Sequence, residues 1–60
     1  MNISQAVEAL QRGCKVKRDS STIVHIMDRG TIYFVNGTNR FRKTLFLVED
    51  VLGDDWRIVN

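Results

Sequence analysis

EDVLGDDWRIV, residues 49–59, contains the only tryptophan of this 60-residue chain, Trp56. In the run that follows, side chains alternate in direction if the chain is extended, so that Trp56 and Ile58 face one way while Arg57 and Val59 face the other. Burying an aromatic side chain removes roughly 150–250 Å² from water, and so short a chain has few competing anchors. We therefore expect Trp56 to anchor the core and residues 56–59 to form the closing strand of a sheet.

The bulk composition predicts one small cytosolic domain over residues 1–60. The chain is 43% hydrophobic and 27% charged, which is typical of globular proteins. No apolar run approaches the ~18 residues of a membrane span, and Cys14, the single cysteine, has no partner for an internal disulfide. A domain of this size buries only about 60% of the surface of its unfolded chain, so a partner or homo-oligomerisation would add stability.

A helix is predicted over residues 5–12. Ser4 can cap its first amides, and Gly13 can adopt the left-handed conformation that ends it. Glu8 and Arg12 lie four apart on the solvent side. The opposite side carries an apolar stripe formed by Ile3, Ala6, Val7 and Leu10. Because two to three turns are too few to be stable alone, this helix is expected to pack on a sheet.

Strands are predicted over residues 14–18, 22–27, 31–35 and 40–47. In the first, Cys14 and Val16 alternate with basic residues and are expected to point inward. Gly30 is expected to supply the positive φ of one hairpin turn. Asn36-Gly37 predicts a type I′ turn, which needs positive φ at both central positions.

The remaining segment, residues 49–55, predicts a helical turn that is broken by Gly53 and has Val51 and Leu52 tucked under it. The closing strand is expected to pair antiparallel with residues 14–18. The predicted fold class is therefore α+β, with one N-terminal helix packed on a small antiparallel β-sheet of about five strands.

Catalytic chemistry is not indicated. His25 is the only histidine and Cys14 the only cysteine, so neither a zinc site nor a Cys/His or Ser/His/Asp set is recognisable. We expect His25 to be at the surface or hydrogen-bonded, and Cys14 to be a small core residue. The prediction is a protein that is not an enzyme and holds neither a cofactor nor a metal.

The net charge is only +2, but the charges are unevenly distributed. Basic residues gather at positions 12–18 and 40–43, and acidic residues at positions 49–55. This indicates a bipolar surface, suited either to a partner of complementary charge or simply to solvation. The candidate partner-binding residues are Arg40, Phe41, Arg42 and Lys43 on one predicted strand and Lys15, Lys17 and Arg18 on another.

The strand over residues 40–47 is expected to be a sheet edge, because the Asn36-Gly37 hairpin pairs only one of its sides. Nucleic-acid binding is a second hypothesis, suggested by Tyr33, Phe34 and Phe41, since a sheet can offer aromatic platforms edged by cations. The acidic segment offsets the positive field, so a protein partner is favoured over nucleic acid.

Two parts of the chain resemble a family of small bacteriophage proteins: NISQAVEAL with GCKVKR at residues 2–10 and 13–18, and EDVLGDDWRIV at residues 49–59. That family includes the Thoeris anti-defence sponges, which sequester cyclic-nucleotide immune signals. The sponge-type members have an aromatic, Gly- and Asn-rich loop after the basic strand, where this chain has only Asp19-Ser20-Ser21-Thr22. In size and style the chain is also similar to the T-even phage antitoxin Dmd, which neutralises a host endoribonuclease toxin.

The resemblance implies a phage-type inhibitor that binds and neutralises a host defence protein, such as a toxin endoribonuclease, in the host cytoplasm. Two alternatives stay open. One is a sponge for a cyclic-nucleotide immune signal, and the other is a small nucleic-acid-binding module.

Overall fold

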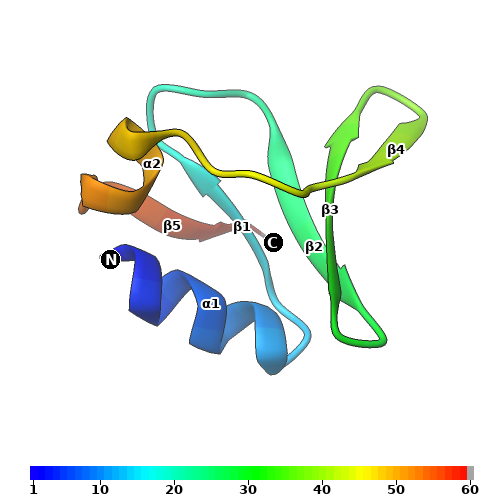
Figure 1. Cartoon of the computed structure of the whole chain (residues 1–60), viewed down its shortest axis with the longest axis horizontal. Helices are drawn as coiled ribbons and strands as arrows, with labels where there is room; N and C mark the ends of the chain where they lie inside the picture. The colour runs from blue at the N-terminus through cyan, green and yellow to red at the C-terminus, as the bar shows by residue number, and fades with distance from the viewer. Residues whose placement is uncertain (60) are drawn as a thin grey trace.

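A computed structural model describes residues 1–59 and shows one helix packed on a five-stranded antiparallel sheet, with a short second helix (Figure 1). The elements follow in the order α1 (Ile3–Gln11), β1 (Lys15–Arg18), β2 (Val24–Asp28), β3 (Thr31–Asn36), β4 (Asn39–Arg42), α2 (Val48–Leu52) and β5 (Trp56–Val59). The predicted α+β class is confirmed.

The strand order is β4-β3-β2-β1-β5, so the last strand of the chain lies beside the first. Lys15 pairs with Val59 and Arg18 with Trp56, in the antiparallel register expected for the closing strand. The edges of the sheet are therefore β4 and β5, and the prediction that the strand after Asn36-Gly37 is an edge is confirmed.

The register places Val16, His25, Phe34 and Phe41 side by side on one face of the sheet. We call this the covered face, because α1 packs over its β1–β5 half and residues 43–52 cross it on the way from β4 to β5 (Figure 1). Neighbouring residues in each strand point the other way. We call that side the open face, because neither helix of the described chain lies over it.

The core lies between α1 and the covered face. It consists of Ala6, Ala9, Leu10, Val16 and Trp56. Trp56 is 2% exposed, and its Nε1 donates to the backbone oxygen of Asp50 at 2.9 Å. The expected anchoring role of Trp56 agrees with this burial.

The helix begins earlier than predicted. Asn2, not Ser4, is the N-cap: its side chain accepts from the amide of Gln5, and the Gln5 side chain accepts from the amide of Asn2, both at 2.9 Å. This reciprocal capping box satisfies two amides at once, which a serine at position 4 cannot do for a helix starting at Ile3. Gly13, with φ of +88°, follows the end of α1 as expected.

The two hairpin turns differ in how well they were predicted. Arg29 and Gly30 both have positive φ, and Asp28 pairs with Thr31, so the expected glycine is in place. At the second turn the type I′ prediction is wrong. Asn36 itself pairs with Asn39, which leaves Gly37 and Thr38 as the central residues, and Gly37 alone has positive φ. A glycine at the first central position is the pattern of a type II′ turn.

The segment after β4 departs from the predicted strand over residues 40–47. Strand β4 ends at Arg42, and the last backbone bond to β3 runs from Lys43 N to Ile32 O at 2.8 Å. The chain then leaves the sheet so that the ring of Phe46 can pack on His25 and Trp56.

Helix α2 also differs from expectation. Val51 and Leu52 are not tucked under it but are exposed. The side of α2 that faces the domain is instead the polar side, which carries Asp50.

Candidate functional site

The open face combines an apolar centre with a basic rim. Its members alternate with the residues of the covered face along every strand. The apolar members are Val24, Ile26, Tyr33, Val35 and Val59, and the basic ones are Lys15, Lys17, Arg40, Arg42 and Arg57. Within it lies a shallow hollow of about 270 Å³, lined by Lys15, Val24, Ile26, Val35 and Val59.

Two cations of the open face are paired. Arg40 Nη2 lies 2.8 Å from Asp28 Oδ2, and this hydrogen bond raises the pKa of the guanidinium. The same group lies over the Tyr33 ring, 4.0 Å from its centroid, as in a cation–π contact. Arg57 Nη1 lies 3.3 Å from Asp19 Oδ1.

The other cations leave an excess of positive charge on this face. Lys15 and Arg42 are exposed and form no ion pair with any residue of the described chain 1–59. Lys17 Nζ donates to the backbone oxygens of Arg18 and Ser21, at 3.3 and 2.9 Å, and keeps its charge uncompensated. An anionic surface that approaches the open face would therefore meet unpaired cations on the inner strand β1 and on the edge strand β4.

The seven candidate residues from the sequence divide between the two faces. Arg40 and Arg42 lie on the open face together with Lys15 and Lys17, although they come from strands at different positions in the sheet. The remaining three, Phe41, Lys43 and Arg18, lie on the covered side. Runs of consecutive candidates cannot share one face, because side chains in a strand alternate.

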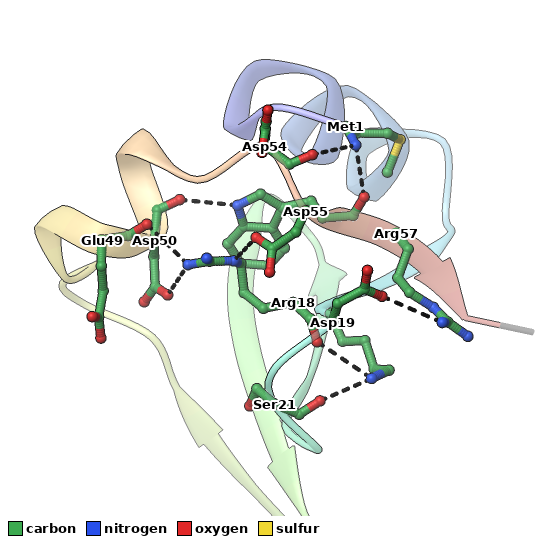
Figure 2. Close-up of polar contacts among 11 residues, drawn as sticks. Met1, Arg18, Asp19, Ser21, Glu49, Asp50, Asp54, Asp55 and Arg57 are labelled. Atoms are coloured by element: carbon green, nitrogen blue, oxygen red, sulfur yellow. Dashed lines mark hydrogen bonds and ion pairs between the residues drawn. The ribbon is translucent and has the colours of Figure 1, made fainter.

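The guanidinium of Arg18 is bonded to groups of its own chain. Its Nη1 donates to Asp50 Oδ1 and to the backbone oxygen of Glu49, both at 2.9 Å, and its Nε donates to Asp55 (Figure 2). The side chain is only 16% exposed. The hydrogen bond from Arg18 holds the pKa of Asp55 below its usual range, and the same bond raises the pKa of Arg18.

Gly53 makes room for this arrangement. A Cβ at position 53 would lie 2.6 Å from the guanidinium carbon of Arg18 and 3.0 Å from the backbone oxygen of Glu49. Its φ of −69° is one that any residue adopts. A glycine is therefore needed at position 53 because a side chain would not fit, not because of its backbone conformation. Arg18 is a structural clamp between β1, α2 and the start of β5.

The aromatic residues do not form one platform. Phe34 and Phe41 stack on each other on the covered face, with ring centroids 5.3 Å apart. Tyr33 alone lies on the open face, where the Arg40 guanidinium covers one side of its ring. The array of stacking rings that single-stranded nucleic acid uses is thus divided between opposite faces.

His25 lies on the covered face and does not match its prediction. It is 6% exposed, and neither ring nitrogen has a hydrogen-bond partner in the described chain. Its ring stacks on Phe46 at 5.8 Å and meets Trp56 edge-on at 5.4 Å. Burial, followed by the nearby Lys43 ammonium, lowers the pKa of His25 and so favours the neutral ring.

A second hollow, of about 510 Å³, lies beside this histidine between β2 and residues 43–50. Its lining mixes the Arg18–Asp50 ion pair with Phe34, Lys43 and Glu49. Cations and carboxylates are balanced here. The ring nitrogens of His25 are sealed from it, because the surrounding side chains leave them almost no accessible surface.

A scan against protein-family models and searches of curated proteins and solved structures found no match to the chain. Within residues 1–59, no three His, Cys, Asp or Glu side chains lie close enough together to hold a metal ion. In the same residues, neither helix has the length and apolarity needed to span a membrane.

Sequence reasoning missed part of the open face. Arg57 and Tyr33 belong to it, as do the aliphatic residues of β2. The signal that could have found them is the period-2 alternation once the strand order is known. The predicted strand order already brought residues 14–18 and 56–59 together, but the candidates were chosen by charge along single strands and not by the face of the sheet that they share.

Proposed function

We propose that this chain is a non-catalytic binding protein that engages an acidic protein surface through its open face. In the setting implied by the resemblance to small bacteriophage proteins, it is an inhibitor that neutralises a host defence protein in the host cytoplasm. The observation that carries the proposal is the open face itself, an uncovered sheet surface with an apolar centre and a rim of five basic side chains.

The composition of this face suits a protein interface. Specific interfaces have an apolar centre and a polar rim, with Arg and Tyr enriched and acidic residues depleted. Here Val24, Ile26 and Val35 form the centre, and the hollow among them can receive an apolar side chain of the partner. Lys15 and Arg42 would speed encounter with an acidic partner and exclude basic ones.

The alternatives have less support. A sheet that binds single-stranded nucleic acid stacks bases on several exposed aromatic rings, and this face offers Tyr33 alone. A sponge for an anionic nucleotide requires a pocket with excess positive charge, whereas the larger hollow, beside His25, has Glu49 and Asp50 in its wall.

The test is a comparison of charge-reversed variants in affinity capture from bacterial host lysate. Lys15→Glu with Arg42→Glu reverses two cations of the open face. Arg12→Glu with Arg29→Glu makes the same change in net charge on α1 and at the β2–β3 turn, outside that face. We expect one acidic protein to be retained by the wild type and by the control pair, and lost by the open-face pair.

Circular dichroism of each variant establishes that the sheet is intact. Retention of the same protein by the folded Lys15→Glu/Arg42→Glu variant contradicts the proposal. If nuclease treatment abolishes capture and the affinity falls steeply as salt is raised, the open face binds nucleic acid instead.

A further inference from the structure

The segment formed by residues 45–52 exposes more large apolar side chains than the core buries. We call it the apolar arm; it follows β4 and includes α2 (Figure 1). Its most exposed members are Leu45 at 82%, Leu52 at 78% and Val48 at 74%, and Leu47 and Val51 are also exposed. Against these, the core contains only three side chains larger than alanine.

An ordinary surface helix turns its apolar stripe toward the core. Helix α2 does the opposite. Its polar side faces the domain, where Asp50 accepts from Arg18 through its carboxylate and from Trp56 Nε1 through its backbone oxygen. Three hydrogen bonds, two from Arg18 and one from the buried Trp56, fix this orientation. The apolar side is thus held outward in a defined geometry, and a partner that binds it need not order it first.

An exposed apolar patch on so small a protein indicates an association surface. The charges that flank the arm favour a second copy of the same chain as the occupant. Lys43 precedes the arm with its ammonium 5.0 Å from the centroid of the Phe46 ring, and the exposed carboxylate of Glu49 lies within the arm without an ion pair to any described residue. In a contact whose two-fold axis crosses the arm near its middle, the two arms run antiparallel and Lys43 of each copy approaches Glu49 of the other.

The area is also compatible with a dimer. A specific interface uses about 800 Å² per partner, close to a fifth of the 4400 Å² surface of this chain. The arm and Ile23 contribute six exposed apolar side chains to such a contact. We propose that the protein forms a two-fold symmetric homodimer through the apolar arm, which leaves the open face of each copy available.

The first experiment is sedimentation velocity of the full chain over a wide concentration range. The wild type is expected to approach the mass of two chains. Leu45→Glu with Leu52→Glu should weaken association by about a hundredfold or more, because it brings like charges together in an apolar contact. Ser4→Glu with Thr38→Glu adds the same charge at exposed positions outside the arm and its neighbours and should dimerise as the wild type does.

A charge swap tests the symmetric geometry. Lys43→Glu and Glu49→Lys should each weaken the dimer, and the double variant should restore it, as expected for a direct pair across the interface. The inference is overturned if the wild type keeps the mass of one chain at every concentration, or if Leu45→Glu/Leu52→Glu associates as tightly as the wild type. The open-face proposal fails by a different result. It fails if the Lys15→Glu/Arg42→Glu variant still captures the same host protein, whether or not the chain dimerises.

Discussion

Arg18 and Asp55 are hydrogen-bonded across 37 positions of sequence, from the end of β1 to the residue before β5. The same guanidinium reaches Asp50 and the backbone of α2, and it lies over the Trp56 ring, 5.9 Å from its centroid. One side chain therefore joins the strand that follows α1 to the segment that closes the sheet.

Replacing Arg18 with alanine should lower the midpoint of thermal unfolding, because it leaves the partly buried carboxylates of Asp50 and Asp55 without their shared cation and removes three hydrogen bonds. The matched control is Arg12→Ala, which removes the exposed pair with Glu8 at 2.7 Å. An exposed pair at this spacing contributes about 0.3–0.5 kcal/mol. Equal melting temperatures for the two variants, measured by circular dichroism, would show that Arg18 is not a clamp.

Gly53→Ala should destabilise the wild type because the new methyl group displaces the guanidinium of Arg18. In an Arg18→Ala background the same change should cost less, since the two closest contacts are gone, only the 3.0 Å approach to the backbone oxygen of Glu49 remains, and φ at position 53 is ordinary. Urea unfolding of the four proteins of this double-mutant cycle measures the difference. Strict additivity would mean that Gly53 and Arg18 act independently.

Stability should fall as pH drops through about 6.5, the ordinary pKa of histidine. The folded state lowers the pKa of His25, so below pH 6.5 the unfolded chain binds a proton that the folded chain resists, and the contribution of neutral His25 is lost. Lys43 strengthens the effect and Asp50 opposes it. His25→Phe should remove this dependence, as measured by urea unfolding between pH 5 and pH 8, and a wild type with a flat profile would contradict the burial of a neutral ring.

The same His25→Phe variant should be at least as stable as the wild type at pH 8. Two ring nitrogens without partners disappear, and an unsatisfied buried group costs about 1–3 kcal/mol. Stacking on Phe46 can continue with a phenyl ring. A marked loss of stability would indicate a hydrogen bond from the imidazole that this geometry lacks.

Trp56→Ala should leave a largely unfolded chain. Truncating a buried tryptophan costs about 3–5 kcal/mol, which is comparable to the whole stability expected for a domain of this size. Arg57→Ala, on the opposite face of the same strand, is the control and should melt close to the wild type. A cooperative melt of Trp56→Ala near that of the wild type would remove Trp56 from the core.

The fold could be predicted from sequence where local pattern and global contacts agree. Alternation in the run from Trp56 and around Val16 predicted the two terminal strands, the expectation that the closing strand fills a free edge of the sheet predicted their pairing, and the glycines at positions 13 and 30 marked real turns. The N-cap was misplaced because Asn2 and Ser4 are both good capping residues, and the side chain of Gln5 decides between them.

The candidate site was less predictable. Lys15, Lys17, Arg40 and Arg42 were identified from charge, but their separation from Arg18 and Lys43 follows from strand direction and register. The outward orientation of Val51 and Leu52 could not be read from α2 alone, since five residues have no clear period. It depends on the attachment of Asp50 to groups far away in sequence, Arg18 and Trp56.

The strand order also has a consequence for biosynthesis. The meander of β2, β3 and β4 uses neighbouring residues, whereas β1 can pair on its second side only when β5 exists. Pairing between distant segments is slow because a long loop must close first. On the ribosome, β1 therefore stays an unpaired edge until residues 56–59 leave the exit tunnel. In that interval the unpaired side of β1 exposes backbone donors and acceptors that a strand of another chain can pair with.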